Sequence, residues 1–115
     1  MVLCLGEEDY FCCNDDSTSI MDDYQNFRKT WKCTCCNLPV VIEATTEDDD
    51  IIRYYRLSAK DLEDGDFVHV PGAGFSEVLA VGKQANGYFV AIKEYRRLSR
   101  LDERKFFNTL YTGRF

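Results

Sequence analysis

The chain has 115 residues, of which 45% are apolar, so it can bury one modest core and form one domain or two very small ones. No apolar run approaches the roughly 20 residues that cross a bilayer, and the acidic N-terminus lacks the basic flank of a signal peptide. These features argue against a membrane partner and predict a cytoplasmic protein. In that compartment clustered cysteines are metal ligands more often than disulfides.

The net charge of -6 is unevenly distributed along the chain. Residues 1–50 carry 12 acidic and 3 basic side chains, whereas residues 94–115 carry 3 acidic and 6 basic ones. The acidic half is expected to repel nucleic acid and to attract a protein partner with a basic surface. The basic end can form a cationic patch or the solvated face of a helix, and we favour the helix.

The N-terminal half begins with a short predicted strand over residues 9–13, followed by a turn rich in Asn, Asp and Ser. Apolar residues at helical spacing then predict a helix over residues 19–29 with one buried stripe. That stripe consists of Ile20, Tyr24 and Phe27. β-Branched residues predict a strand over residues 40–44.

Cysteine spacing is the most informative feature of this half. Cys33 and Cys36 form a Cys-x-x-Cys motif on a tight turn, the arrangement in which two thiolates bind one metal ion. Cys12 and Cys13 lie about twenty residues upstream and can supply the other half of a tetrahedral site. We therefore predict a structural Zn²⁺ ion bound by Cys12, Cys13, Cys33 and Cys36.

The fourth ligand stays open, because adjacent cysteines in an extended chain point to opposite sides. Cys12 is our choice for it, and Cys4, Asp16 and Cys35 are the alternatives. His69 stands alone within a predicted strand and is not expected to bind metal. Two other interpretations compete with a metal site: buried thiols that act as small apolar side chains, and disulfides.

A run of like charges at residues 45–50 predicts an exposed turn or linker that divides the chain into domains 1–47 and 51–115. In the second domain, short β-prone runs separated by tight turns predict a meander curled into a small barrel. The predicted strands cover residues 51–57, 67–70, 77–81 and 88–92, with a hairpin loop at 82–87. Asn86 and Gly87 in that loop suit positive φ angles.

A helix is predicted over residues 100–110. Ser99 is placed to cap its N-terminus, and Asp102 and Glu103 fall in the first turn, where the helix dipole favours acidic side chains. Its apolar face is expected to cover the barrel.

Two segments resemble known families. Residues 31–42, from Trp31 through the Cys-x-x-Cys turn into Val-Val-Ile, are similar to the second hairpin of a zinc ribbon, although adjacent cysteines stand where that family has a second Cys-x-x-Cys. Residues 62–92, with Leu-x-x-Gly-Asp-Phe-Val-His-Val and two further strand patterns, resemble an SH3-like barrel of the Tudor or KOW kind. The resemblance implies a β-rich α+β fold, in which a zinc-ribbon-like subdomain packs on a barrel with a C-terminal helix. Families with these modules are often adaptors in transcription, translation or chromatin.

No set of residues forms a recognisable active site. The chain has one histidine, and its glycine stretch at 72–74 lacks the lysine of a phosphate-binding loop. We therefore predict a non-enzymatic regulator, an adaptor or an inhibitor, that binds a protein with a basic surface. The alternatives are a nucleic-acid-binding module and a thiol-based redox or metal sensor. Aromatic and basic side chains that alternate in the sequence are the predicted partner-binding residues: Tyr54, Tyr55, Arg96 and Arg97.

Overall fold

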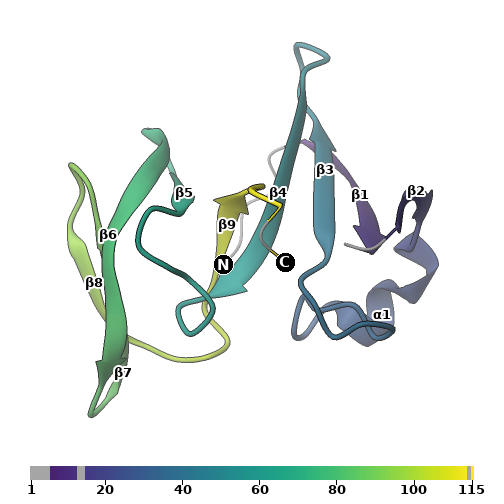
Figure 1. Ribbon diagram of the computed structural model, residues 1–115. Coiled ribbons are helices and arrows are strands. Elements are labelled where there is room, and N and C mark those ends of the chain that lie inside the picture. The colour runs from purple at the N-terminus through teal and green to yellow at the C-terminus, as the bar shows by residue number, and fades with distance from the viewer. Residues whose placement is uncertain (1–5, 13–14, 114) are drawn as a thin grey trace. The chain divides into compact units, whose positions relative to one another are not determined.

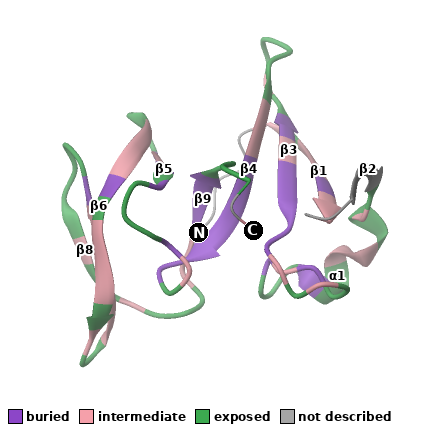
Figure 2. Ribbon diagram, in the orientation of Figure 1, coloured by how far each residue is buried: buried purple, intermediate pink, exposed green. Residues whose placement is uncertain are grey.

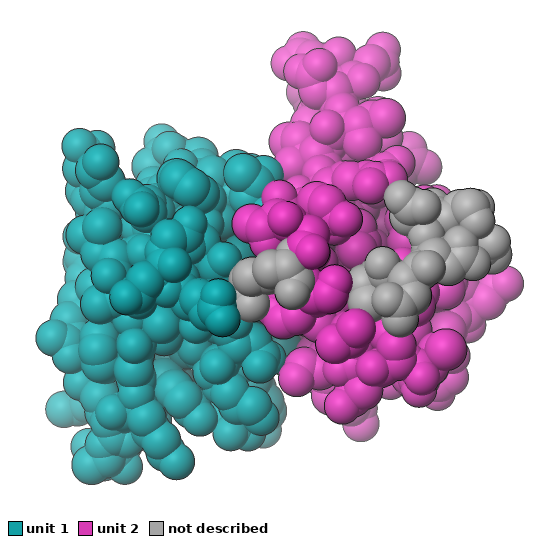
Figure 3. Space-filling model, in the orientation of Figure 1, with its two compact units in different colours: residues 1–2, 57–110 teal, residues 3–56, 111–115 magenta. Residues whose placement is uncertain are grey.

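The computed structural model describes residues 6–12, 15–113 and 115, with the side chains of 15–18 excepted. These residues form two compact units (Figure 3). Unit 1 comprises Leu57–Leu110, and unit 2 comprises residues 6–56 together with Tyr111–Phe115. Unit 1 is therefore inserted into the sequence of unit 2. Among the described helices, none has the length and apolar character that a membrane span requires.

Unit 2 is an antiparallel sheet with the strand order β2-β1-β3-β4 (Figure 1). Its strands are β1 (Glu7–Cys12), β2 (Asp15–Ser19), β3 (Val41–Thr45) and β4 (Ile51–Ser58), whose last two residues belong to unit 1. The register places Tyr10 beside Ile42 and Ile42 beside Tyr54. β3 is buried on both sides, because Val41 and Ile42 point to opposite faces and are both inaccessible to solvent.

The predicted helix over 19–29 is shorter in the structure. A 3₁₀ turn (Met21–Asp23) leads into α1 (Tyr24–Phe27). Trp31 stops the helix because it has a left-handed φ of 55°, and its N–H donates to Phe27 O at 2.7 Å. The expected stripe still packs inward, and the Phe27 side chain is fully buried.

Aromatic rings fill the core of unit 2. Tyr10, Tyr24, Phe27 and Trp31 have ring centroids 5.4 to 5.9 Å apart, within the range of favourable aromatic pairs. These rings join β1, α1 and the segment that leads to the cysteines into one cluster.

Unit 1 is a second antiparallel meander, with the order β9-β5-β6-β7-β8. Its strands are β5 (Phe67–Val70), β6 (Gly74–Gln84), β7 (Gly87–Ile92), β8 (Arg97–Leu101) and β9 (Phe106–Leu110). The strands predicted at 67–70, 77–81 and 88–92 are confirmed. Buried residues on these strands, coloured purple in Figure 2, form an aliphatic core. It includes Val68, Val70, Val78, Val90 and Ile92.

The sheet is not closed. The barrel predicted from residues 62–92 is therefore present only as an open meander, with β8 at the end of the strand order. Gly87, in the β6–β7 hairpin, has the positive φ angle that was predicted for this loop, at 130°. A Cβ atom there would come within 2.5 Å of the carbonyl oxygen of Leu101, so only glycine fits.

The helix predicted over 100–110 is wrong: β8, a turn and β9 occupy this segment. Asp102 does not sit in the first turn of a helix. Its side chain accepts a hydrogen bond from the N–H of Arg104 at 2.7 Å, and its carbonyl accepts one from Lys105 at 3.2 Å. Asp favours such local turns over helix interiors, and the following Phe-Phe-Asn-Thr-Leu run has strong β-propensity.

The charged run at 45–50, predicted to separate two domains, forms the turn between β3 and β4. Thr46 O accepts from Asp49 N–H at 3.0 Å, and Asp49 has a φ of 62°, which Asp tolerates. The compact units part later in the chain, at Leu57.

Candidate metal centre

Cys33 and Cys36 lie in a hydrogen-bonded turn closed by the bridge between Lys32 and Pro39. The N–H of Cys33 donates to Leu38 O at 2.8 Å, and the N–H of Asn37 donates back to Cys33 O at 2.8 Å. Asn37 has a φ of 57°, a left-handed conformation that Asn adopts more readily than most residues. These bonds hold the two cysteines of the motif on one compact loop.

Two contacts attach this turn to the rest of unit 2. Asp23 accepts hydrogen bonds from Thr34 Oγ1 and from Asn26 Nδ2, both at 2.6 Å, which tie the turn to α1. The same bonds lower the pKa of the Asp23 carboxyl, because they favour its charged form. Trp31, immediately before the turn, packs its ring against Tyr10 of β1 at 5.9 Å.

Cys12 ends β1, where the register of the β1–β2 pair shifts between Phe11 and Cys12. Because Tyr10 lies two residues earlier in the aromatic cluster, β1 is held against the segment that carries Cys33. The packing of rings thus brings together cysteines that are 24 residues apart in sequence, such as Cys12 and Cys36.

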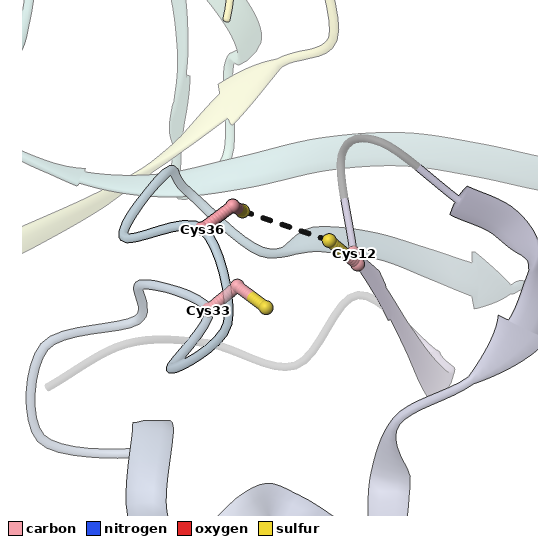
Figure 4. A group of neighbouring side chains, drawn as sticks. All are labelled: Cys12, Cys33 and Cys36. Carbon is pink, nitrogen blue, oxygen red and sulfur yellow. Dashed lines mark hydrogen bonds between the residues drawn. The ribbon is translucent and has the colours of Figure 1, made fainter.

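The sulfur atoms of Cys12, Cys33 and Cys36 all lie within 4.8 Å of one another and point into one space (Figure 4). Cys12 Sγ and Cys36 Sγ are 3.6 Å apart. Two thiolates on one tetrahedral zinc ion, with Zn–S bonds near 2.3 Å, are separated by about 3.8 Å. The three thiols are therefore placed as three corners of such a site, and they could hold a metal ion.

Cys33 is buried and the other two are half-buried. Cys35, from the same loop, is exposed and does not belong to the group. Cys4 and Cys13 lie outside the described residues, as does the side chain of Asp16. His69 lies in β5 of unit 1, where its ring packs on Phe75 and burial lowers its pKa.

A second cluster, which the sequence analysis did not identify, lies in the core of unit 2. Arg56 Nη2 is 2.5 Å from Glu8 Oε2, and the two side chains are 3% and 5% exposed. Tyr54 donates its hydroxyl to the same oxygen, and Tyr10 donates to Glu8 Oε1 at 2.9 Å. The Arg56 guanidinium also stacks on Trp31, 4.3 Å from the ring centroid.

This network perturbs the titration of its members. Burial works to lower the pKa of Arg56, but the charge and hydrogen bond of Glu8 outweigh it and raise the pKa. Burial, reinforced by Glu8, raises the pKa of the Tyr10 hydroxyl well above its usual value. Both groups are thus held in their protonated forms.

One sequence signal could have revealed the pair. Arg56 stands between Tyr55 and Leu57 in the apolar, β-prone run of residues 51–57, a pattern typical of a buried strand. A buried cation in such a strand requires a carboxylate partner, and Glu8 is the partner supplied by β1.

The predicted partner-binding residues separate into two groups. Tyr54 and Tyr55 are 0% and 1% exposed, so the prediction is corrected: they belong to the core. Arg96 and Arg97 are exposed, and Arg97 stacks over Phe89 at 4.0 Å.

Comparison of the chain with protein-family models, with curated proteins and with solved structures gave no match. The functional argument therefore rests on the residues described above.

Proposed function

We propose that the chain is a non-enzymatic protein-binding module whose N-terminal unit is held together by a structural Zn²⁺ ion. The observation that supports the metal most directly is the convergence of three thiols from β1 and the Cys-x-x-Cys turn. Sulfur-rich sets of this kind select zinc or iron–sulfur clusters, and structural zinc sites are completed by a fourth protein ligand. Cys13, which directly follows Cys12, is the proposed fourth ligand.

The metal has a clear structural role in this location. Unit 2 carries twelve acidic and six basic side chains, whereas unit 1 carries eight of each. Self-repulsion opposes the compact state of unit 2. A metal ion shared by β1 and the turn would cross-link these two elements, and it would oppose the repulsion through its bonds to sulfur and not through its charge, because four thiolates outweigh the two positive charges of zinc.

The proposed interaction surface is the tip of the β3–β4 hairpin, which projects from unit 2 (Figure 1). Four successive acidic residues at this tip, 47–50, are exposed. Ile51 follows them and is 63% exposed, the highest exposure among the large apolar side chains of the described residues. An apolar anchor beside like charges suits a partner with a basic surface, because the charges accelerate encounter and the anchor contributes binding energy on burial.

Native mass spectrometry of protein purified without chelator tests the metal. We expect one zinc ion per chain, lost in Cys33→Ser and weakened in Cys13→Ser. Cys35→Ser is the matched control, since Cys35 lies on the same loop outside the sulfur group. A metal-free wild-type protein, with every thiol reactive, would contradict the proposal.

Quantitative co-purification tests the surface. The triple variant Glu47→Gln, Asp48→Asn, Ile51→Ser should lose a partner that the wild type enriches. Its control, Glu103→Gln, Asp64→Asn, Leu79→Ser, makes the same chemical changes at exposed positions of unit 1 and should keep that partner. Equal loss in both variants, or no enrichment by the wild type, would contradict a binding function of the hairpin tip.

A second candidate function, nucleic-acid binding, is favoured by one observation at β8. Two hollows of about 350 and 360 Å³ both border Arg100, and the second is also lined by Arg104 and Lys105. Cations around open hollows suit phosphate groups. Titration of labelled single-stranded DNA at low salt should then show binding that Arg104→Ala weakens and Lys83→Ala does not; no binding would eliminate this candidate.

A further inference from the structure

Two sulfur atoms of the metal group that come from different elements lie in close contact. Cys12 Sγ and Cys36 Sγ, from β1 and from the turn, are 3.6 Å apart. This distance is too long for a disulfide bond, which is about 2.05 Å. A small movement of either side chain closes the gap, since both are half-buried.

We propose that Cys12 and Cys36 are an oxidisable pair, which hydrogen peroxide converts into a disulfide that links β1 to the turn. The pairing rests on the sulfur positions alone. A second consequence, release of the metal, rests on the proposed function: once both sulfurs are in a disulfide, the ion loses two thiolate ligands.

The alternative pairings are disfavoured by position. Cys33 is 3% exposed, so an oxidant in solution reaches the half-buried Cys36 first, and Cys12 Sγ lies 3.6 Å from Cys36 Sγ. Cys35 is exposed but lies outside the group of converging sulfurs. Oxidation therefore selects the pair that spans the two elements and not a pair within the loop.

The chemistry needs one equivalent of peroxide. The thiolate of one cysteine attacks peroxide, so that an S–O bond forms, the O–O bond breaks and hydroxide leaves, giving a sulfenic acid. The thiolate of the other cysteine attacks that sulfur, the S–S bond forms, and the S–O bond breaks with loss of a second hydroxide. The two sulfurs together lose two electrons, and the peroxide is reduced to two hydroxide ions, which take up the two protons that the thiols released on ionisation and become water.

The test uses the full chain and hydrogen peroxide, with free thiols alkylated before mass spectrometry. We expect the intact mass to fall by two hydrogen atoms and two thiols to become unreactive. Fragmentation of the cross-linked peptides should join Cys12 to Cys36. Cys35→Ser is the control and should form the same link at the same rate. A link between Cys33 and Cys36, a link that uses Cys4, Cys13 or Cys35, or oxidation to sulfinic acid without a link would overturn the proposal.

Cys33→Ser separates this proposal from the metal site. This variant should lose the zinc and still form the Cys12–Cys36 disulfide, because Cys33 takes no part in that bond. If the fluorescence of Trp31 shows that this variant is unfolded, zinc-loaded wild-type protein takes its place, and the Cys12–Cys36 link is sought together with release of the metal. Disulfide formation in a wild type that binds no zinc would refute the proposed function alone. A zinc-loaded wild type that peroxide neither links nor strips of metal would refute the oxidisable pair alone.

Discussion

Different kinds of interaction stabilise the two units of this protein. Unit 1 has equal numbers of acidic and basic side chains and an aliphatic core, with residues such as Val68, Val78 and Val90 almost fully buried. Unit 2 has a large acidic excess, a core of aromatic rings, a buried ion pair and a group of converging thiols. Unit 1 also buries polar side chains such as Asp66, which accepts a hydrogen bond from the N–H of Glu63, whereas unit 2 adds a buried ion pair and thiols that could hold a metal ion.

This difference indicates which substitutions should destabilise each unit most. A valine core loses stability gradually as methyl groups are removed. Removal of one buried charge or one metal ligand causes a large loss of stability in a single step, because its partner is left without compensation in a medium of low dielectric. Changes in unit 2 should therefore be the more damaging ones.

If the proposed zinc ion is bound, its removal should have the largest effect. Structural zinc contributes on the order of 10 kcal/mol of apparent binding free energy, which is comparable to the whole stability of a small domain. Trp31 is the only tryptophan and lies in unit 2, so its fluorescence reports on that unit alone. A strong chelator should expose Trp31, while amide exchange at Val68 and Val90 stays slow. If the chelator exposed Trp31 and also accelerated amide exchange at Val68 and Val90, or if it did neither, the two units would not differ in their dependence on metal.

The buried ion pair comes next. Arg56→Met leaves Glu8 buried without its cation and should lower the free energy of unfolding of unit 2 by about 3–5 kcal/mol. Urea denaturation followed by Trp31 fluorescence measures it. Arg53→Met is the control, because its pair with Glu43 is partly exposed and should cost at most about 1 kcal/mol. Equal costs for the two variants would mean that burial does not distinguish them.

A smaller effect is expected in the aliphatic core. Val68→Ala should destabilise unit 1 by about 2 kcal/mol, measured by amide exchange, and leave the zinc stoichiometry unchanged. Leu79→Ala, at a position 53% exposed, should change stability by no more than about 0.5 kcal/mol. A fall in zinc content in Val68→Ala would show that the units are not independent.

The smallest effect concerns pH. Because the pKa of Tyr10 is raised in the folded state, its contribution to stability is fully present below its unfolded pKa of about 10 and is lost as pH rises through the folded value. Urea midpoints between pH 8 and 11 should fall more steeply with pH in the wild type than in Tyr10→Phe. Parallel slopes would show that the Tyr10–Glu8 contact does not influence stability.

The strands of unit 1 were predictable because their sequence repeats local signals: short β-branched runs, tight turns and a glycine at position 87. The C-terminal helix was mispredicted because Ser99, Asp102 and Glu103 are as common in turns as they are at the start of a helix. Pairing of β9 with β5 decided the outcome, and this is a tertiary effect.

In the candidate site, cysteine spacing was enough to indicate Cys33 and Cys36 and to propose Cys12 as a further ligand, and the structure brings these three sulfurs together. Glu8 and Arg56 were missed because their partnership spans 48 residues and depends on strand register. The apolar neighbours of Arg56 indicate a buried strand, but nothing local in the sequence states that the face of β4 that carries Arg56 is covered.

The insertion of unit 1 into the sequence of unit 2 has a consequence for how the protein is made. Tyr111 donates its N–H to Arg53 O at 3.1 Å, and Phe115 packs edge-on against the buried ring of Tyr55 at 5.1 Å. Both residues leave the ribosome only after all of Leu57–Leu110 has been translated. During synthesis, Tyr55 is therefore made before the segment that packs against its ring, and this contact can form only once residues 57–110 have been added to the chain.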